Sequence, residues 1–288
     1  MANYKFFKDY KKEIKDSIKG FKVIYTDLDG TFFNERGCLI KDYRNDYYFD
    51  AVKLLRKIKE MERDIVMISG RNRYQLRYIA QMIGLENYVC ELGAELVYNL
   101  GKEVYPTFDN HKTGYELTRG GKDLVKITEL LKKNFPGRIE GKIEWSEHRT
   151  YNALFFGEID LGRAKRLLES EGYEGLKIVD NGFSSLVTLD LDIERLHIYN
   201  LLPAGVDKSN GIMLDKKKRN FKAGDCIALG DSLEDLKMAG EVKYFFLMKN
   251  ALEHKETIAD ELKKYENVYI TENEMNRGWA EVMGYLVD

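Results

Sequence analysis

The sequence predicts an α/β fold in which a parallel β-sheet core is interrupted by an inserted α+β domain. Short apolar strands alternate with amphipathic helical stretches over residues 21–104 and again over 203–288, which is the pattern of βαβ units with a parallel sheet. Residues 105–202 carry several strand candidates between these parts, so we expect the inserted domain there. Residues 1–20 precede the core as an N-terminal helix.

Length and composition narrow the class of protein. The chain has 288 residues, of which 44% are hydrophobic, enough for two domains with real cores. A formal net charge of −2 gives no global field that would attract nucleic acid or a membrane. The three cysteines form no C-x-x-C pair, so we expect neither a metal knuckle nor a disulfide framework, and a cytoplasmic protein. We also expect no signal peptide and no membrane span.

The N-terminal helix has its apolar residues on one face. Helical spacing relates Phe6, Phe7, Tyr10, Ile14 and Ile18, and Gly20 provides a plausible end. Such a helix either packs on the core or binds a partner, and we favour packing.

The first strand leads into two acids. The stretch Val23–Thr31 begins with β-branched and aromatic residues and ends in Asp27-Leu28-Asp29-Gly30-Thr31. Residues two apart on a strand share a face, so Asp27 and Asp29 could face one site at the carboxyl edge of the sheet. Neighbouring carboxylates repel each other, and a divalent cation relieves that repulsion. The alternative is an ordinary acidic turn.

Further helices and strands follow in alternation. In the core we expect helices at 50–61, 73–83, 233–239 and 255–264, strands at 64–68, 88–90, 225–230 and 244–248, and a hairpin about 99–101. In the inserted domain we expect helices at 122–133 and 162–171, strands at 151–156, 176–179, 186–191 and 196–201, and a hairpin turn at Asn181-Gly182.

The second strand of the core ends in Ser69-Gly70-Arg71. The Ser69 hydroxyl and nearby amides could hold phosphoryl oxygens, and Arg71 could add a bidentate contact. The alternative is that Ser69 only caps the following helix.

Two later segments also offer charged residues. Lys208 stands at the start of a helix, where the helix dipole disfavours a cation and an anionic partner would compensate. Asp231 follows a strand, and Asp235 lies four residues further, one helical turn away. Asp231 could bind magnesium while Asp235 orients Lys208 or a metal-bound water, or Asp231 or Ser232 could simply cap the helix.

These motifs, in this order, resemble those of the haloacid dehalogenase-like hydrolases, which are mostly phosphatases. The domain inserted between Ser69 and Lys208 resembles the large cap of the type IIB, Cof-like or sugar-phosphate phosphatase group. Phe246–Ala251 and Thr271–Gly278 resemble later segments of the family, so the resemblance covers nearly all of residues 21–288. It implies a Rossmann-like core and an α+β cap that closes over the site.

The resemblance also implies roles for individual residues. Asp27 would be the nucleophile and Asp29 the general acid/base, with Ser69 and Lys208 completing the catalytic set. Mg²⁺ would be held by Asp27, Asp231 and the backbone carbonyl of Asp29. Glu234 and Asp235 would lie around the metal, although many relatives have Asn where this chain has Glu234. Substrate or phosphate contacts would come from Gly30, Thr31, Gly70, Arg71 and Asn250.

The implied function is magnesium-dependent hydrolysis of a phosphate monoester of a small metabolite, a sugar phosphate in particular, through an aspartyl-phosphate. We expect neither nucleic acid nor a membrane as partner, and the oligomeric state stays open. In the cap, candidate sugar contacts are His148, Arg149, Tyr151, Asn152 and Asn200, each of which could equally be an ordinary surface residue. Alternative functions are a phosphosugar mutase and a non-catalytic sugar-phosphate-binding protein.

Overall fold

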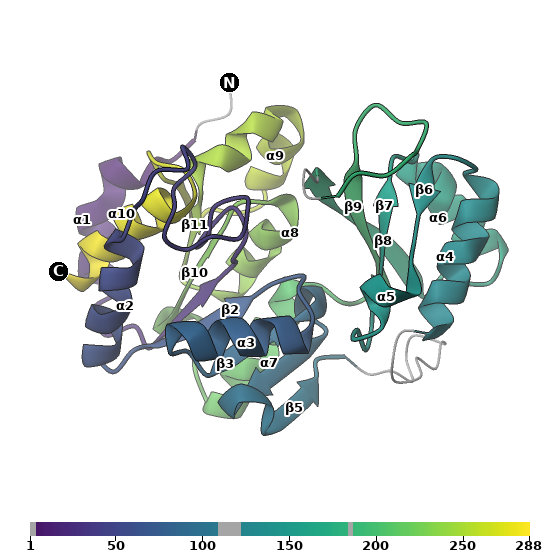
Figure 1. Cartoon of the computed structure of the whole chain (residues 1–288). Helices are drawn as coiled ribbons and strands as arrows, with labels where there is room; N and C mark the ends of the chain where they lie inside the picture. The colour runs from purple at the N-terminus through teal and green to yellow at the C-terminus, as the bar shows by residue number, and fades with distance from the viewer. Residues whose placement is uncertain (1–3, 109–121, 184–186) are drawn as a thin grey trace. The chain divides into compact units, whose positions relative to one another are not determined.

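The computed structural model describes residues 4–108, 122–183 and 187–288 (Figure 1). The chain forms two compact units. The first consists of Met1–Gly70, Leu76–Tyr105 and Asp207–Asp288, and the second of Arg71–Gln75 and Pro106–Val206. The longer segment of the second unit, Pro106–Val206, overlaps the predicted inserted domain, 105–202, while Arg71–Gln75 comes from the predicted core. The domain bounds stay a prediction. That the second unit acts as a cap stays a prediction.

An eight-stranded sheet forms the centre of the first unit, in the order β12-β11-β10-β1-β2-β3-β4-β5 (Figure 1). Its strands are β1 Val23–Thr26, β2 Asp64–Ile68, β3 Asn87–Cys90, β4 Glu95–Tyr98, β5 Glu103–Pro106, β10 Cys226–Gly230, β11 Tyr244–Leu247 and β12 Val268–Ile270. β1 lies between β2 and β10 and is parallel to both. The sheet is parallel from β12 to β3, and β4 runs antiparallel to β3. The predicted α/β fold is confirmed.

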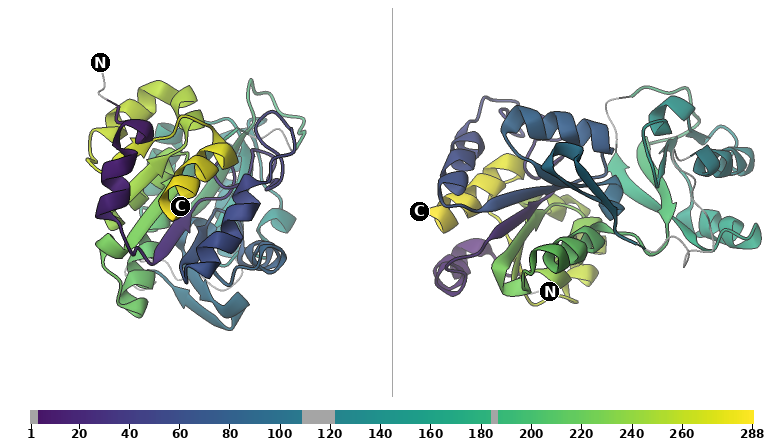
Figure 2. Two further views of the ribbon diagram at one scale, coloured as in Figure 1. Left: turned by 90° about the vertical axis from the view of Figure 1, so that its left-hand side faces the viewer. Right: turned by 90° about the horizontal axis from the view of Figure 1, so that it is seen from below.

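Helices cover both faces of this sheet (Figures 1 and 2). On one face lie α1 Phe7–Ser17, α2 Asp50–Glu60, α3 Arg73–Ile83 and α10 Met275–Val287. On the other lie α7 Lys208–Arg219, α8 Leu233–Leu236 and α9 Lys255–Leu262. In β1, Val23 and Tyr25 enter one core and Ile24 the other, because successive strand residues point to opposite faces. This double burial explains why β1 is apolar without alternation.

The N-terminal helix packs on the core of the first unit. Phe7 and Ile14 of α1 are each 1% exposed. The Phe7 ring meets the Phe246 ring of β11 edge to face, with centroids 5.3 Å apart. Of the two alternatives for this helix, the packed one is observed.

The second unit is built on an antiparallel sheet of order β6-β7-β9-β8. Its elements are α4 Lys122–Asn134, β6 Ile139–Glu140, α5 Ile143–Ser146, β7 Ala153–Gly157, α6 Leu161–Ser170, β8 Leu176–Phe183 and β9 His197–Pro203. Leu131 of α4 and Leu168 of α6 pack with Phe155 and Tyr199 of the sheet in one core. Helices therefore cover one face of an antiparallel sheet, which is the α+β arrangement.

The predicted hairpin turn at Asn181-Gly182 is wrong. Both residues lie inside β8, where the pairing with β9 shifts register between Asp180 and Phe183. Gly182 has φ +87°, a conformation that glycine adopts easily. A bulge uses the same turn-forming residues as a hairpin but continues the strand.

The predicted strand at 186–191 is also wrong for the residues that the structure describes. Residues 187–191 form no strand, and Leu186 lies outside the described residues. Val187, Leu189 and Leu191 are half-buried while Thr188 and Asp190 are exposed, so the alternating pattern reflects partial burial without a partner strand.

Within the described ranges, no helix is both long and apolar enough to cross a bilayer. The three cysteines form no disulfide within the described residues, and Cys90 and Cys226 are buried while Cys38 is half-buried.

Candidate active site

Asp27 directly follows the central strand β1. Its amide donates to the carbonyl of Leu229 at 3.0 Å, so the pairing of β1 with β10 continues one residue beyond Thr26. Asp27 is only 5% exposed, since strands flank it on both sides. The fold thus holds this carboxylate at the carboxyl edge of the sheet, where open α/β sheets bind ligands.

The turn after Asp27 brings the chain against Asp231. Gly30 has φ +86°, and a Cβ on it would lie 2.3 Å from Asp231 Oδ2, so only glycine fits here. Thr31 Oγ1 donates to Asp231 Oδ1 at 3.1 Å. Asp29 is half-buried in the same turn. Gly30 and Thr31 therefore shape the acidic site, and their phosphate contacts stay a prediction.

Lys208 reaches the same place from the first residue of α7. Asp207 caps this helix by accepting from the Ser209 amide at 3.0 Å, and Asn210 completes a capping box. Lys208 Nζ donates to Asp27 Oδ1 and to Asp235 Oδ1, both at 2.6 Å. The residue is 5% exposed. Burial lowers its pKa, but the two carboxylates outweigh that effect and raise the pKa, so the amine stays protonated.

Asp235 holds Lys208 from the opposite side. Its Oδ2 accepts from the amides of Asp231 and Ser232, at 3.2 and 3.0 Å, and from Ser232 Oγ at 2.6 Å. Ser232, not Asp231, is the N-cap of α8. Gly230 permits this packing, because a Cβ there would lie 2.3 Å from Asp235 Cβ. Both oxygens of Asp235 are therefore engaged, and the one that binds Lys208 is positioned to orient it. Of the two roles expected for Asp235, the contacts favour orienting Lys208 over orienting a metal-bound water.

Asn250 fixes Asp231. Its Nδ2 donates to Asp231 Oδ2 and to the carbonyl of Gly30, both at 3.0 Å, and its Oδ1 accepts from the Met275 amide at 3.1 Å. The sequence predicted Asn250 as a phosphate contact. The contacts found place it as a support for the acidic group, and the phosphate contact stays a prediction.

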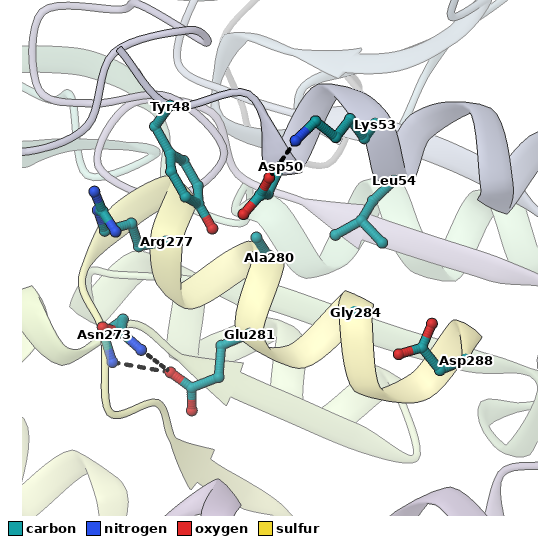
Figure 3. Close-up of a pocket in the computed structure, with 10 residues that line it drawn as sticks. All are labelled: Tyr48, Asp50, Lys53, Leu54, Asn273, Arg277, Ala280, Glu281, Gly284 and Asp288. Atoms are coloured by element: carbon teal, nitrogen blue, oxygen red, sulfur yellow. Dashed lines mark hydrogen bonds and ion pairs between the residues drawn. The ribbon is translucent and has the colours of Figure 1, made fainter. Parts of the chain in front are cut away.

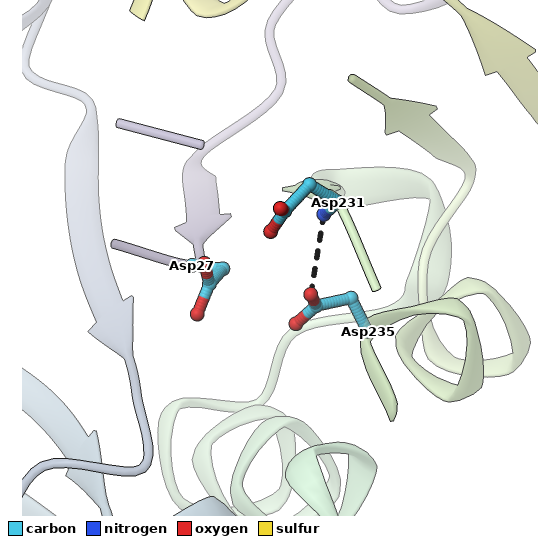
Figure 4. Close-up of side chains that lie close together, drawn as sticks. All are labelled: Asp27, Asp231 and Asp235. Atoms are coloured by element: carbon cyan, nitrogen blue, oxygen red, sulfur yellow. Dashed lines mark hydrogen bonds between the residues drawn. The ribbon is translucent and has the colours of Figure 1, made fainter. Parts of the chain in front are cut away.

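Asp27, Asp231 and Asp235 form an acidic cluster (Figure 4). One carboxylate oxygen from each lies within 4.8 Å of the others. Burial, opposed by Lys208 and reinforced by Asp235, raises the pKa of Asp27 to about 7. Burial and the charges of Asp27 and Asp235 raise the pKa of Asp231. One ammonium therefore faces three carboxylates.

This cluster fits a hard divalent cation. Carboxylate oxygens are the ligands that Mg²⁺ prefers, and a cation would offset the surplus negative charge. Asp27 and Asp231 are the better candidate ligands, because both oxygens of Asp235 already accept short hydrogen bonds. The cluster contains Asp235 where the sequence analysis placed the backbone carbonyl of Asp29, and the Asp29 contact stays a prediction.

Ser69 lies at the end of β2, the strand next to β1, and is 2% exposed. It does not cap α3: Asn72 does, because Asn72 Oδ1 accepts from the Tyr74 and Gln75 amides at 3.1 and 3.0 Å. The alternative of Ser69 as a cap is therefore wrong. Gly70 ends this segment of the first unit and Arg71 belongs to the second unit, so their phosphate contacts stay predictions.

Glu234 is engaged beside the cluster. Its two carboxylate oxygens accept from Lys237 Nζ at 2.7 and 2.8 Å, one helical turn further on. The predicted place of Glu234 around a metal stays a prediction.

Three of the candidate sugar contacts in the second unit are buried, which rules out an ordinary surface position for them. Arg149 Nη1 donates to Asn152 Oδ1 at 2.9 Å, and Asn152 Nδ2 donates to Asn200 Oδ1 at 3.2 Å. Asn200 is 1% exposed, and its Nδ2 has no hydrogen-bond partner among the residues that the structure describes. His148 is exposed and Tyr151 half-buried.

A separate groove of about 510 Å³ lies between α2 and α10 (Figure 3). Its polar side chains already pair with one another: Lys53 with Asp50 at 2.9 Å, and Asn273 with Glu281 at 2.8 Å. None of the candidate site residues lines this groove, so it gives no support for a second ligand site.

Named relatives match nearly the full length of this chain. A glucosyl-3-phosphoglycerate/mannosyl-3-phosphoglycerate phosphatase of Persephonella marina is 25% identical over 90% of this chain and 94% of its own. A kanosamine-6-phosphate phosphatase of Bacillus subtilis is 23% identical over 92% of each chain. The solved sucrose-phosphatase of Synechocystis matches with a TM-score of 0.63 at 14% identity, covering 92% of this chain and 98% of that one.

A sequence model of the haloacid dehalogenase-like hydrolases matches residues 24–269, most of the chain and all of the candidate site. The match begins in β1, three residues before Asp27, and ends in β12. The chain therefore belongs to the haloacid dehalogenase-like hydrolase family.

Proposed function

We propose that this hydrolase is a magnesium-dependent phosphatase that releases phosphate from a phosphorylated sugar or sugar conjugate through an aspartyl-phosphate on Asp27. The observation that carries the proposal is the buried carboxylate of Asp27, held by Lys208 through one oxygen at 2.6 Å. Its other oxygen is left for attack on phosphorus. The relatives named above, which carry the names of phosphatases, support the same reaction.

The chemistry proceeds in two displacements. In the first, Asp27 Oδ2 forms a bond to phosphorus as the bond from phosphorus to the sugar oxygen breaks, and Asp29 donates its proton to that leaving oxygen. In the second, Asp29 takes a proton from water, whose oxygen attacks the phosphorus of the aspartyl-phosphate. The bond to Asp27 breaks, phosphate leaves, and both carboxyl groups return to their starting state.

Lys208 stabilises the charge that moves in both steps. Opposite charges about 4 Å apart attract each other by about 4 kcal/mol at the dielectric constant typical of a protein surface. Asp235 keeps the ammonium in place, since its second oxygen is fixed by Ser232. Mg²⁺ held by Asp27, Asp231 and the Asp29 carbonyl would neutralise the phosphate and the surplus charge of the acidic cluster.

The relatives and the second unit support a phosphorylated sugar as the substrate class. The three relatives named above act, by their names, on a phosphoglycerate glycoside, an amino-sugar phosphate and a sucrose phosphate. The buried Arg149–Asn152–Asn200 chain supplies amide and guanidinium groups of the kind that bind sugar hydroxyls, and we propose it for that role.

The test is phosphate release from a panel of phosphorylated sugars with Mg²⁺, for wild type, Asp27→Asn and the matched control Asp50→Asn. Asp50 is an exposed carboxylate that pairs with Lys53 away from the site. We expect release by wild type and the control, and its loss in Asp27→Asn and in chelator. Release that survives in Asp27→Asn would contradict the proposal. A reaction that needs a sugar bisphosphate and releases no phosphate would instead identify a phosphosugar mutase.

A further inference from the structure

A second buried charged group lies on α7, seven residues beyond Lys208. Asp215 is 0% exposed. Its Oδ2 accepts from the Tyr25 hydroxyl at 2.5 Å and from the Arg219 guanidinium, and its Oδ1 accepts from the Tyr98 hydroxyl at 2.5 Å. Burial and the Asp215 carboxylate raise the pKa of both tyrosines, so both stay protonated and donate.

Two contacts therefore join one face of β1 to one face of α7. Tyr25 and Asp27 are two residues apart, which places them on the same side of the strand about 7 Å apart. Lys208 and Asp215 are seven residues apart, two helical turns or about 10.5 Å. Tyr25 bonds Asp215, and Asp27 bonds Lys208. The helix is thus attached to the catalytic strand at two points along its length.

Neighbouring strands extend this attachment. Arg219 Nη1 donates to Asp64 Oδ2 at 2.7 Å, and Asn87 Nδ2 donates to the same oxygen at 2.8 Å. With Tyr25 and Tyr98, each strand from β1 to β4 contributes one polar side chain to this group. An anchored helix cannot slide along the sheet without breaking several of these bonds together.

Close packing and the Asp215 hydrogen bonds both restrain α7 on the sheet. A Cβ on Gly211 would lie 2.4 Å from Val89 Cγ1, and one on Gly93 would lie 1.9 Å from the Asp207 carbonyl oxygen. Such close contacts bring α7 onto the sheet. Dispersion contacts are not directional, whereas a hydrogen bond between two named atoms is.

We propose that Tyr25 and Asp215 are positioning residues, which hold α7 along β1 so that Lys208 Nζ bridges Asp27 and Asp235. The catalytic part of this inference rests on the proposed phosphatase function. A purely structural role explains the geometry less well, because an apolar pair of similar volume would fill the same space without burying a charge. The hydrogen bond from Tyr25 to Asp215 restrains the position of α7 along β1, and Lys208 needs that position to bridge Asp27 and Asp235.

The test compares Tyr25→Phe with Tyr98→Phe, assayed with p-nitrophenyl phosphate and Mg²⁺. Each variant removes one hydroxyl that bonds Asp215 at 2.5 Å, but only Tyr25 stands on the strand that carries Asp27. We expect kcat to fall about tenfold or more in Tyr25→Phe with KM nearly unchanged, and to fall by a smaller factor in Tyr98→Phe, whose hydroxyl attaches the helix to β4. Urea unfolding reports the stability of both variants.

Equal kcat in the two variants and wild type, with stability alone reduced, would overturn the proposal. Crystal structures of both variants supply a readout that does not depend on turnover. We expect the distance from Lys208 Nζ to Asp27 Oδ1, 2.6 Å here, to lengthen beyond hydrogen bonding in Tyr25→Phe only. If wild type hydrolyses no ester, the phosphatase function fails, and this distance still decides: an unmoved Lys208 overturns the positioning role.

Discussion

Helix α7 carries a buried charged group near each end, and the two differ in how their charges are balanced. At its first residue, Lys208 is shared by Asp27 and Asp235, and Asp231 completes an acidic cluster with these two carboxylates. Negative charge is in surplus there, and the pKa of Asp27 is raised to about 7, mainly by burial.

Two turns further on, the charges cancel. Asp215 and Asp64 share Arg219, and Lys59 Nζ lies 3.3 Å from the Asp64 carboxylate. Two tyrosine hydroxyls complete the shell of Asp215. In the proposed function, a cation and a phosphate ester would complete the group with surplus charge, whereas the balanced group is complete within the chain and would position α7.

The largest effect is expected at the one ammonium of the acidic cluster. Lys208→Met should lower kcat about 10² to 10³-fold, because a buried charge aimed at the reacting group acts mainly in the transition state. Lys216→Met is the matched control on the same helix, since Lys216 pairs with Glu241 away from the cluster. Steady-state kinetics with the best substrate of the panel checks both. Similar losses of kcat in the two variants would contradict a special role for Lys208 in the acidic cluster.

The free energy of unfolding should depend more on the Asp215 group than on the acidic cluster. Without Mg²⁺, Asp215→Asn should lower the free energy of unfolding by about 3 kcal/mol, because it breaks a balanced buried group. Asp27→Asn should leave that free energy unchanged or raise it, because it removes one of the surplus charges. Urea unfolding in chelator measures both. A loss in Asp27→Asn as large as that in Asp215→Asn would show that both groups are equally balanced.

Metal binding should separate the two groups as well. Mg²⁺ at about 100 times its Kd should raise the free energy of unfolding of wild type by about 2.7 kcal/mol. Asp231→Asn should lose this response, while Asp215→Asn should keep it. Thermal unfolding with and without Mg²⁺ gives the comparison, and a response that Asp231→Asn retains would remove Asp231 from the ligands.

The smallest effect is expected at Glu234. Its half-buried carboxylate is engaged by Lys237 one turn away, and ion pairs between residues one helical turn apart contribute only a few tenths of a kcal/mol. Glu234→Gln should therefore change kcat and the Mg²⁺ response by less than about twofold. A tenfold change in either would place Glu234 around the metal.

The fold of the first unit was predictable because its signals are local. Buried parallel strands are continuously apolar, and polar residues at their ends converge wherever strands are parallel neighbours. Asp27 and Asp231 were found in this way, Lys208 and Asp235 from their places at helix starts, and the structure brings the four together. In the second unit, Val187, Leu189 and Leu191 alternate like a strand, but alternation reports burial and does not supply a pairing partner.

The Asp215 group was not predictable from the sequence. Asp215 stands beside Lys216, Lys217 and Lys218, a setting typical of a solvated helix end. Its tyrosine partners lie 190 and 117 positions away along the chain. Only the docking of α7 on the sheet turns an apparently solvated acid into the centre of a buried group.

The most direct test of the account is whether Asp27 becomes phosphorylated. Wild type and Asp27→Asn would be mixed with p-nitrophenyl phosphate and Mg²⁺ and quenched in acid within milliseconds. Mass spectrometry of the peptides would then locate any phosphoryl group. We expect one phosphoryl group on the wild-type peptide that contains Asp27 and none in the variant. Turnover with no phosphoryl group on that peptide, or with one on another residue, would contradict it.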